Sequence, residues 1–328
     1  MTKLTRKLLL SVITVVLTVV ALGTTTFAWF TLTHVANVQQ FDAEIIADSG
    51  IEIAIGNADP AKENFGLNWV TTLTTLAIEN YIATKHTQGF KFNHVTTADG
   101  QIFRNLGIGA QGSTNTTSYL ELPIHFKSNS AVAIAWTGVT LTSENFNWSV
   151  DQSFNAIGHD GTAYVANPVT SGDVLTLNAA DAFRIAIIGQ VGGATQVVGY
   201  ENPATTTAPY NHVLGTGGTG YEGNLFSGTA GDADAVYEGT FGAHSYFYKD
   251  SQTSPFGIED FTTLVTQTSI TNERIVDMVA QGEDPLVGSD YYGSVIIRIW
   301  LEGWDLNAYN SILSQIITTS FQFTGLDV

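Results

Sequence analysis

Short apolar runs recur along the chain and constrain its fold more than any other feature. Phe41–Ala47 and residues 50–56 carry apolar side chains at alternate positions, and Asp48, Ser49 and Gly50 separate the two runs. A spacing of two residues is typical of strands that bury one face, and the polar residues between them favour a turn. Further runs of strand length lie at residues 118–127, 131–141, 174–177, 182–188, 294–301 and 318–323. The pattern predicts a mainly β protein.

The composition favours strands over helices. The chain of 328 residues contains 43 Thr and 32 Gly, whereas charged residues make up 13% of it. Thr favours strands, Gly favours turns, and the Lys, Glu and Arg residues that usually cover helix surfaces are scarce. This argues against a helical bundle. A hydrophobic fraction of 44% also argues against a disordered chain.

The charge balance and the absence of cysteine limit the chemistry and the partners. With 12 Lys and Arg against 30 Asp and Glu, the formal net charge is −18. Nucleic acid is therefore not an expected partner, because its phosphates need Lys and Arg. A chain without Cys has no disulfides, no thiolate metal sites and no cysteine nucleophile.

Helices are expected to be few and short. The pattern predicts helices at residues 272–281 and 305–314, while residues 67–83 fit a helix or a strand equally well. Residues 199–257 are rich in Gly and Thr and have little periodicity, which predicts a loop-rich insertion. The expected architecture is a jelly-roll-like antiparallel β-sandwich with a few short helices, formed by residues 29–328 as a single domain.

The first 28 residues have the pattern of an export signal. A basic segment at residues 1–7 precedes an apolar run at residues 8–22, and small residues follow up to Ala28. This order predicts a signal peptide that is cleaved between Ala28 and Trp29. The alternative is an uncleaved membrane anchor, because the apolar stretch is long enough to cross a bilayer. Both interpretations place the remaining chain outside the cell or at its surface.

Catalytic and metal-binding motifs are absent from the sequence. No pair of His residues has zincin spacing, no Ser lies in a nucleophile-elbow motif, and no phosphate-binding loop is present. We therefore expect no enzymatic activity and no cofactor. Asp232 and Asp234 in the Gly-rich insertion are weak candidates for calcium, since acidic loops can supply oxygen ligands. Ordinary solvated acids are the alternative that we favour.

One aromatic and acidic corner stands out near the C-terminus. It contains Trp300, Glu302, Gly303, Trp304 and Asp305. We interpret it as a tight strand-to-helix corner, in which the glycine permits the turn and the aspartate caps the following helix. The alternative is a carbohydrate-binding site with Trp304 as a stacking surface and Glu302 as a hydrogen-bond acceptor.

Three segments of the sequence form a recognisable set. The first is TTTFAWFTLTHVANVQQFDAEI near the N-terminus, and the second is DAFRIAII at residues 181–188. The third, SVIIRIWLEGWDLNAYNSILSQIITTSFQF, lies at the C-terminal end. In this order they resemble secreted proteins of the camelysin/TasA-like group, which carry a SipW-type signal peptide. Together the segments cover about a quarter of the chain. Camelysin has been classed as a metallopeptidase, but this chain has no zinc motif to receive that activity.

The resemblance implies a subunit of an extracellular fibre or surface layer, in which an N-terminal strand pairs with the sheet of the next subunit. Residues 29–47 would form this donor strand, with the apolar positions Phe30, Val38, Phe41, Ala43 and Ile45. A strand that enters the sheet of a neighbouring subunit pairs with the free backbone groups of that sheet and fills the apolar groove of that subunit. The alternative is that Phe41–Ala47 pairs within its own chain.

These observations lead to one main functional prediction and to several alternatives. We expect a secreted structural protein that assembles with copies of itself into a filament, as in a biofilm matrix, or into a surface coat. A virion coat protein with a jelly-roll fold is the first alternative. A monomeric adhesin or carbohydrate-binding module and a surface hydrolase are the others. The membrane is expected as a partner during export or through the anchor.

Overall fold

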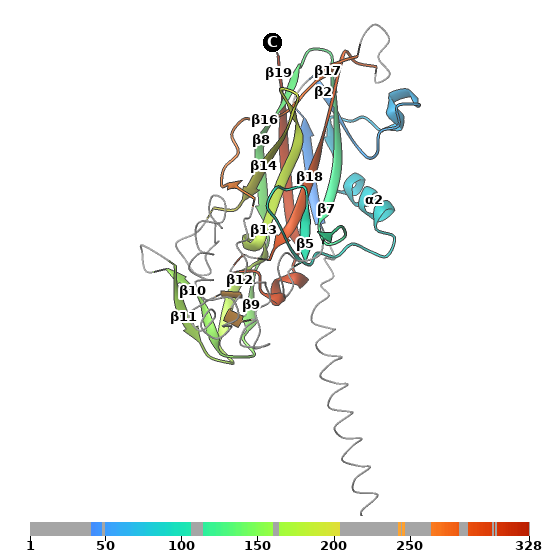
Figure 1. Ribbon diagram of the computed structural model, residues 1–328. Coiled ribbons are helices and arrows are strands. Elements are labelled where there is room, and N and C mark those ends of the chain that lie inside the picture. The colour runs from blue at the N-terminus through green and yellow to red at the C-terminus, as the bar shows by residue number, and fades with distance from the viewer. Residues whose placement is uncertain are drawn as a thin grey trace, which may run out of the picture. The chain divides into compact units, whose positions relative to one another are not determined.

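Figure 1 shows a computed structural model of the chain, which contains two facing β-sheets. It describes residues 41–47, 50–105, 114–159, 164–203, 242–243, 245–246, 264–281, 288–303, 305 and 307–327. The described residues all belong to one compact unit, Asn37–Val328. The mainly β fold predicted from the sequence is confirmed.

The first sheet has five strands, and the C-terminal strand lies at its centre. Its order is β16 (Glu273–Asp277), β8 (Ala133–Thr142), β19 (Ile317–Leu326), β1 (Phe41–Ala47) and β3 (Thr72–Leu73). All neighbours are antiparallel except β1 and β19, which run parallel. Along β19, Ile317, Thr319, Phe321 and Phe323 are buried, whereas Thr318 and Gln322 are exposed. This alternation produces one core face and one polar face.

The second sheet is built around β18 (Tyr291–Glu302). On one side β18 pairs with β13 (Phe183–Val191), which is followed by β14 (Ala194–Glu201) and β15 (Thr266–Gln267). On the other side it pairs with β7 (Leu120–Ser128), which is followed by β2 (Ile51–Ile55). Shorter pairings complete the sheet with β4 (His94–Thr97), β5 (Phe103–Asn105), β6 (Thr114–Asn115) and β17 (Val279–Ala280).

Two small two-stranded sheets lie at one end of the sandwich (Figure 1). They pair β9 (Asn145–Ser149) with β12 (Val174–Asn178), and β10 (Phe154–His159) with β11 (Tyr164–Val169). Helical elements in the described part of the chain include α2 (Thr75–Lys85) and the 3-10 turns η1 (Glu63–Gly66), η2 (Ala179–Ala182) and η3 (Asn310–Ser314).

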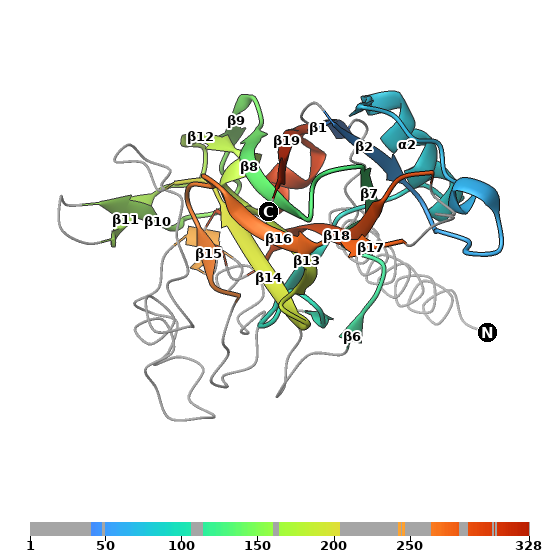
Figure 2. The same cartoon turned by 90° about the horizontal axis from the view of Figure 1, so that it is seen from above.

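The main core lies between the two large sheets, which Figure 2 shows from above. Phe126 of β7 and Phe323 of β19 meet edge to face, with ring centroids 5.1 Å apart, so the two sheets face each other there. Trp136 and Phe321 are fully buried in the same layer. A smaller cluster covers the outer face of the second sheet, where Phe103 contacts Trp300 at 5.3 Å.

Two glycines allow β16 to lie close to the second sheet. A Cβ atom at Gly189 of β13 would stand 2.0 Å from the carbonyl oxygen of Ile275 on β16. A Cβ atom at Gly293 of β18 would stand 3.3 Å from Val276 Cγ2 on β16 and 2.8 Å from the Sδ atom of Met278, which follows β16. A backbone can approach this closely only where no side chain intervenes.

Several local predictions differ from the structure. Residues 272–281 form β16 and β17 and no helix, because their apolar side chains pack against sheet partners. The runs 41–47 and 50–56 form strands, but β1 and β2 belong to different sheets. The ambiguous segment 67–83 contains β3 and most of α2, which Thr74 caps at Ala77 N. The jelly-roll connectivity stays a prediction.

Candidate functional site

The N-terminal strand β1 is the candidate assembly element, and β19 is its main partner. Seven register pairs join the two strands, from Phe41 opposite Ile317 to Ala47 opposite Phe323. On the other side, β3 forms two register pairs with Ile45 and Ile46. The hydrogen bond from Ala47 N to Thr71 O adds one contact there at 3.1 Å. The attachment of β1 therefore depends mostly on the backbone of β19.

The side chains of β1 divide between core and solvent. Ile45 and Ala47 are 0% and 8% exposed, whereas Ile46 is 39% exposed and Glu44 is also at the surface. Three residues, 48–50, connect β1 to β2, which pairs with β7 in the opposite sheet. β1 thus belongs to one sheet, while the segment that follows it belongs to the other.

The predicted donor strand is described only in part. Phe30 and Val38 lie outside the described residues, and for Phe41 and Ala43 the backbone alone is described. Ile45 is buried as the alternation predicts. In the single chain, β1 pairs with β19 of that same chain. The cleavage-site residues Ala28 and Trp29 also lie outside the described part.

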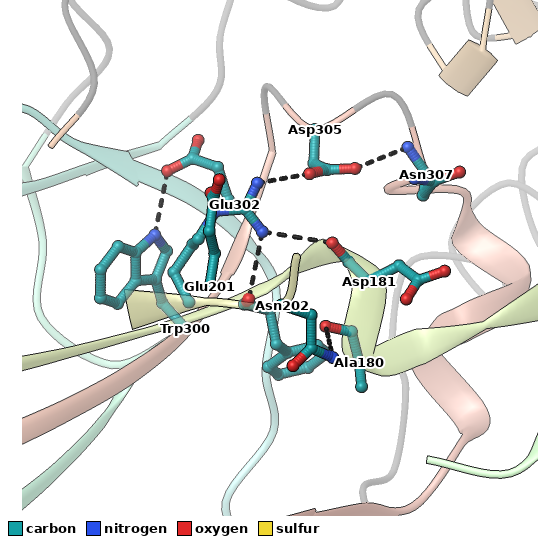
Figure 3. A network of polar contacts seen from close by, with 10 residues as sticks. Ala180, Asp181, Glu201, Asn202, Trp300, Glu302, Asp305 and Asn307 are labelled. Atoms are coloured by element: carbon teal, nitrogen blue, oxygen red, sulfur yellow. Dashed lines mark hydrogen bonds and ion pairs between the residues drawn. The ribbon is translucent and has the colours of Figure 1, made fainter. Parts of the chain in front are cut away.

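The C-terminal corner, where Figure 3 shows Trp300, Glu302 and Asp305, surrounds a buried arginine that sequence reasoning missed. Arg184 of β13 forms ion pairs through Nε with Glu201 of β14 and through Nη2 with Asp305, the latter at 2.5 Å. Its Nη1 donates to the carbonyl oxygens of Asp181 and Phe183 at 3.2 and 3.1 Å. We call Arg184, Glu201, Glu302 and Asp305 the Arg184 cluster.

The fold closes this cluster from several strands. Register places Arg184 beside Glu201 on one side and beside Trp300 on the other, and Glu302 is two residues further along β18. Trp300 Nε1 donates to Glu302 Oε2 at 3.0 Å. The four charged side chains of the cluster are at most 3% exposed. Each of them is therefore removed from bulk water.

Burial changes the acidity of the cluster. Desolvation raises the pKa of Glu201 and of Asp305 above the ordinary range, although Arg184 lies beside both. For Arg184, desolvation acts in the opposite direction, but the surrounding carboxylates raise its pKa overall, so it stays charged. The cluster thus has one permanent cation and three groups that can carry negative charge.

The structure corrects the expected role of the corner. Asp305 does not cap a helix, because residues 305–314 form no α-helix and η3 begins after Tyr309 without a side-chain cap. Its carboxylate accepts from Asn307 N at 2.8 Å and from Arg184 instead. Gly303 supports the corner through a hydrogen bond from its N–H to Val95 O at 2.9 Å.

The carbohydrate-binding alternative loses its acceptor. Glu302 and Trp300 are 2% and 1% exposed, so they offer no surface to a sugar. Trp304 lies outside the described residues. The signal that sequence reasoning could have used is Arg184 itself, a charged residue within an apolar strand run, which usually has a buried partner. No comparable pattern marks Glu201.

A second buried polar group lies on β7. His125 is 7% exposed, and its Nδ1 and Nε2 lie 2.6 Å from Tyr292 Oη and 2.8 Å from Gly56 O. Burial lowers the pKa of His125, which favours the neutral imidazole. Phe65 packs edge to face on Tyr292 at 4.8 Å and helps to cover this site.

Within the described ranges, no group of three or more His, Asp or Glu residues is arranged to hold a metal ion. Asp232 and Asp234 lie in the part of the insertion that the structure does not describe. Among the helices in the described part of the chain, none has the length and apolar character needed to cross a membrane.

Comparisons with known protein families, with curated proteins and with solved structures found no match.

Proposed function

We propose that the chain is an exported structural protein that assembles with copies of itself into an extracellular filament or surface coat. Assembly takes place by exchange of the N-terminal strand β1 between neighbouring copies. The observation that carries the proposal is the pairing of β1 with β19, which spans seven residues on one side while β3 matches only two on the other.

This arrangement makes β1 replaceable by an identical strand. A copy that loses its own β1 exposes the N–H and C=O groups of β19 and the core position that Ile45 fills. The β1 strand of a second copy satisfies the same groups in the same register, because it has the same sequence. Exchange therefore preserves the contacts of the single chain and adds a link between chains.

The direction of the link favours a filament. The donor strand of one copy enters the sheet of the next, so the two surfaces in contact differ, and this head-to-tail arrangement propagates when it does not close into a ring. The polar face beside β1 suits a protein that is packed with copies of itself. Thr140 and Ser320 hydroxyls hydrogen-bond across it at 2.7 Å.

Strand exchange can be tested with single cysteines, since the chain has none of its own. Glu44 and Ser320 are register partners at the outer face. Chains that carry Glu44→Cys are mixed, under conditions that allow assembly, with chains that carry Ser320→Cys, and are oxidised. Exchange predicts a mixed disulfide dimer on a non-reducing gel, because it places β1 of one chain beside β19 of the other. Without exchange, the two engineered cysteines stay in separate molecules and do not meet.

The matched control uses a pair from the body of the sheet. Thr140 and Ser320 are register partners on β8 and β19, which exchange leaves within one chain. Thr140→Cys chains mixed with Ser320→Cys chains should stay monomeric on the gel. Filaments of the secreted protein seen by negative-stain microscopy without the first cross-link would refute strand exchange. Dispersed monomers would refute self-assembly itself.

A further inference from the structure

We propose that the Arg184 cluster retains a proton on its carboxyl groups at neutral pH and acts as a pH-sensitive latch between β14 and the segment 303–309. The proposal is independent of the proposed function. It begins from a count of charges in a place that excludes water. Glu201, Glu302 and Asp305 surround one arginine, and each of the four side chains is at least 97% buried.

Full ionisation of the cluster is unfavourable. Three carboxylates and one guanidinium would give a formal charge of −2 in a buried volume. Transfer of an unbalanced charge out of water costs several kcal/mol, and a buried acid lowers this cost by keeping its proton. The metal alternative finds no support here, because the described carboxylates do not form a group that could hold a metal ion.

A second observation points to the same proton. The Oε1 atom of Glu201 is buried, and no described donor is within hydrogen-bond distance of it. A carboxylate oxygen without a donor is costly in a low-dielectric site, whereas a neutral carboxyl group is much less so. The proton is shared within the cluster, since titrations of groups this close are coupled.

Within the described part of the chain, the groups that face the cluster come from β15, β4, β18 and the segments beside Asp181 and Tyr309. β15 contributes the Thr266 hydroxyl near Glu201, and Tyr309 lies beside Asp305. On β4, His94 Nε2 lies 2.8 Å from Ala308 O. Arg298, two residues before Trp300 on β18, forms an ion pair with Glu121 at 2.7 Å. The Asp181 carbonyl, which precedes β13, accepts from Arg184.

The latch joins segments that are distant in sequence. Arg184 links Glu201, at the end of β14, to Asp305. Asp305 in turn accepts the Asn307 amide, and the Gly303 amide donates to β4. When the pH rises through the folded-state pKa of the cluster, the proton leaves and carboxylate repulsion weakens these contacts. Stability from this source is therefore fully present in acid, and it is lost as the pH rises.

The test compares Glu302→Gln with the native chain across pH. Gln is neutral, has nearly the same shape, and can still accept from Trp300 Nε1. We expect the Tm of the variant to exceed that of the native chain at about pH 8 and the difference to shrink toward about pH 5. In the same pH series, the hydrogen-exchange rate of the Asn307 amide should rise less with increasing pH in the variant than in the native chain.

The control variant is Glu121→Gln. Glu121 also pairs with an arginine, but its side chain is 44% exposed. Removal of its charge should therefore give a profile of Tm against pH that runs parallel to that of the native chain. A parallel profile for Glu302→Gln would overturn the proposal. If that variant does not fold, the infrared spectrum of the native protein decides. The carbonyl band of a protonated carboxyl group at neutral pH supports the latch, and its absence refutes it.

Discussion

The close approach of β16 to the second sheet gives the sharpest prediction about stability. In Gly189→Ala, the new Cβ atom would lie 2.0 Å from the carbonyl oxygen of Ile275 and 3.1 Å from Val295 Cγ1. Carbon and oxygen atoms that are not bonded normally stay more than about 3 Å apart, so one backbone has to move by about 1 Å. The obstacle is backbone rather than the end of a flexible side chain, and a rotamer change does not relieve it.

We expect Gly189→Ala to lower the free energy of unfolding by about 3 kcal/mol, which is at the upper end of the losses caused by overpacking a core. For a domain of this size this corresponds to a fall in Tm of about 6 °C or more, measured by calorimetry. Gln190→Ala, the neighbouring position with a side chain at the surface, is the control and should change stability by less than about 0.5 kcal/mol. An unchanged Tm in Gly189→Ala would refute the packing described for β16.

Two other side chains allow similar tests. Trp300→Phe removes the N–H donor that Glu302 accepts at 3.0 Å and should lower the free energy of unfolding in urea by about 2 kcal/mol. An unchanged urea midpoint would contradict this. Burial holds the pKa of His125 in the folded chain below its ordinary value. As the pH falls through about 6.5, His125 therefore takes up a proton in the unfolded chain before it does so in the folded chain, and the folded state loses stability. His125→Gln should flatten this part of the Tm profile, and a slope equal to that of the native chain would rule out the assignment.

Local patterns were a good guide to where strands form and a poor guide to their partners. The run at 294–301 lies within β18, and the run at 318–323 lies within β19. The runs at 174–177 and 182–188 also form strands and look like a pair in the sequence, but β13 pairs with β14 and β18, whereas β12 pairs with β9. Pairing depends on contacts between residues far apart in the chain, which a period of two residues does not encode.

The helix expected at 272–281 shows how tertiary contacts override local preference. Ile275 and Val276 are buried between the sheets, and β16 pairs with β8 along its length. A strand that completes a sheet satisfies its backbone and buries these side chains together, which a short exposed helix would not achieve. The Asp305 cap failed for a related reason, because Arg184 attracts the carboxylate that would otherwise cap a helix.

The sequence alone determined the class of fold, the main strands and the lack of any recognisable catalytic motif. These depend on residue type and short-range spacing, which can be read directly along the chain. Only the tertiary structure decided that β1 pairs parallel with β19, that Glu302 is buried, and that Arg184 gathers acids from three segments. Most of these features require residues far apart in the chain to meet, as Arg184 and Asp305 do across 121 positions, and their energies arise only when the sandwich closes and excludes water.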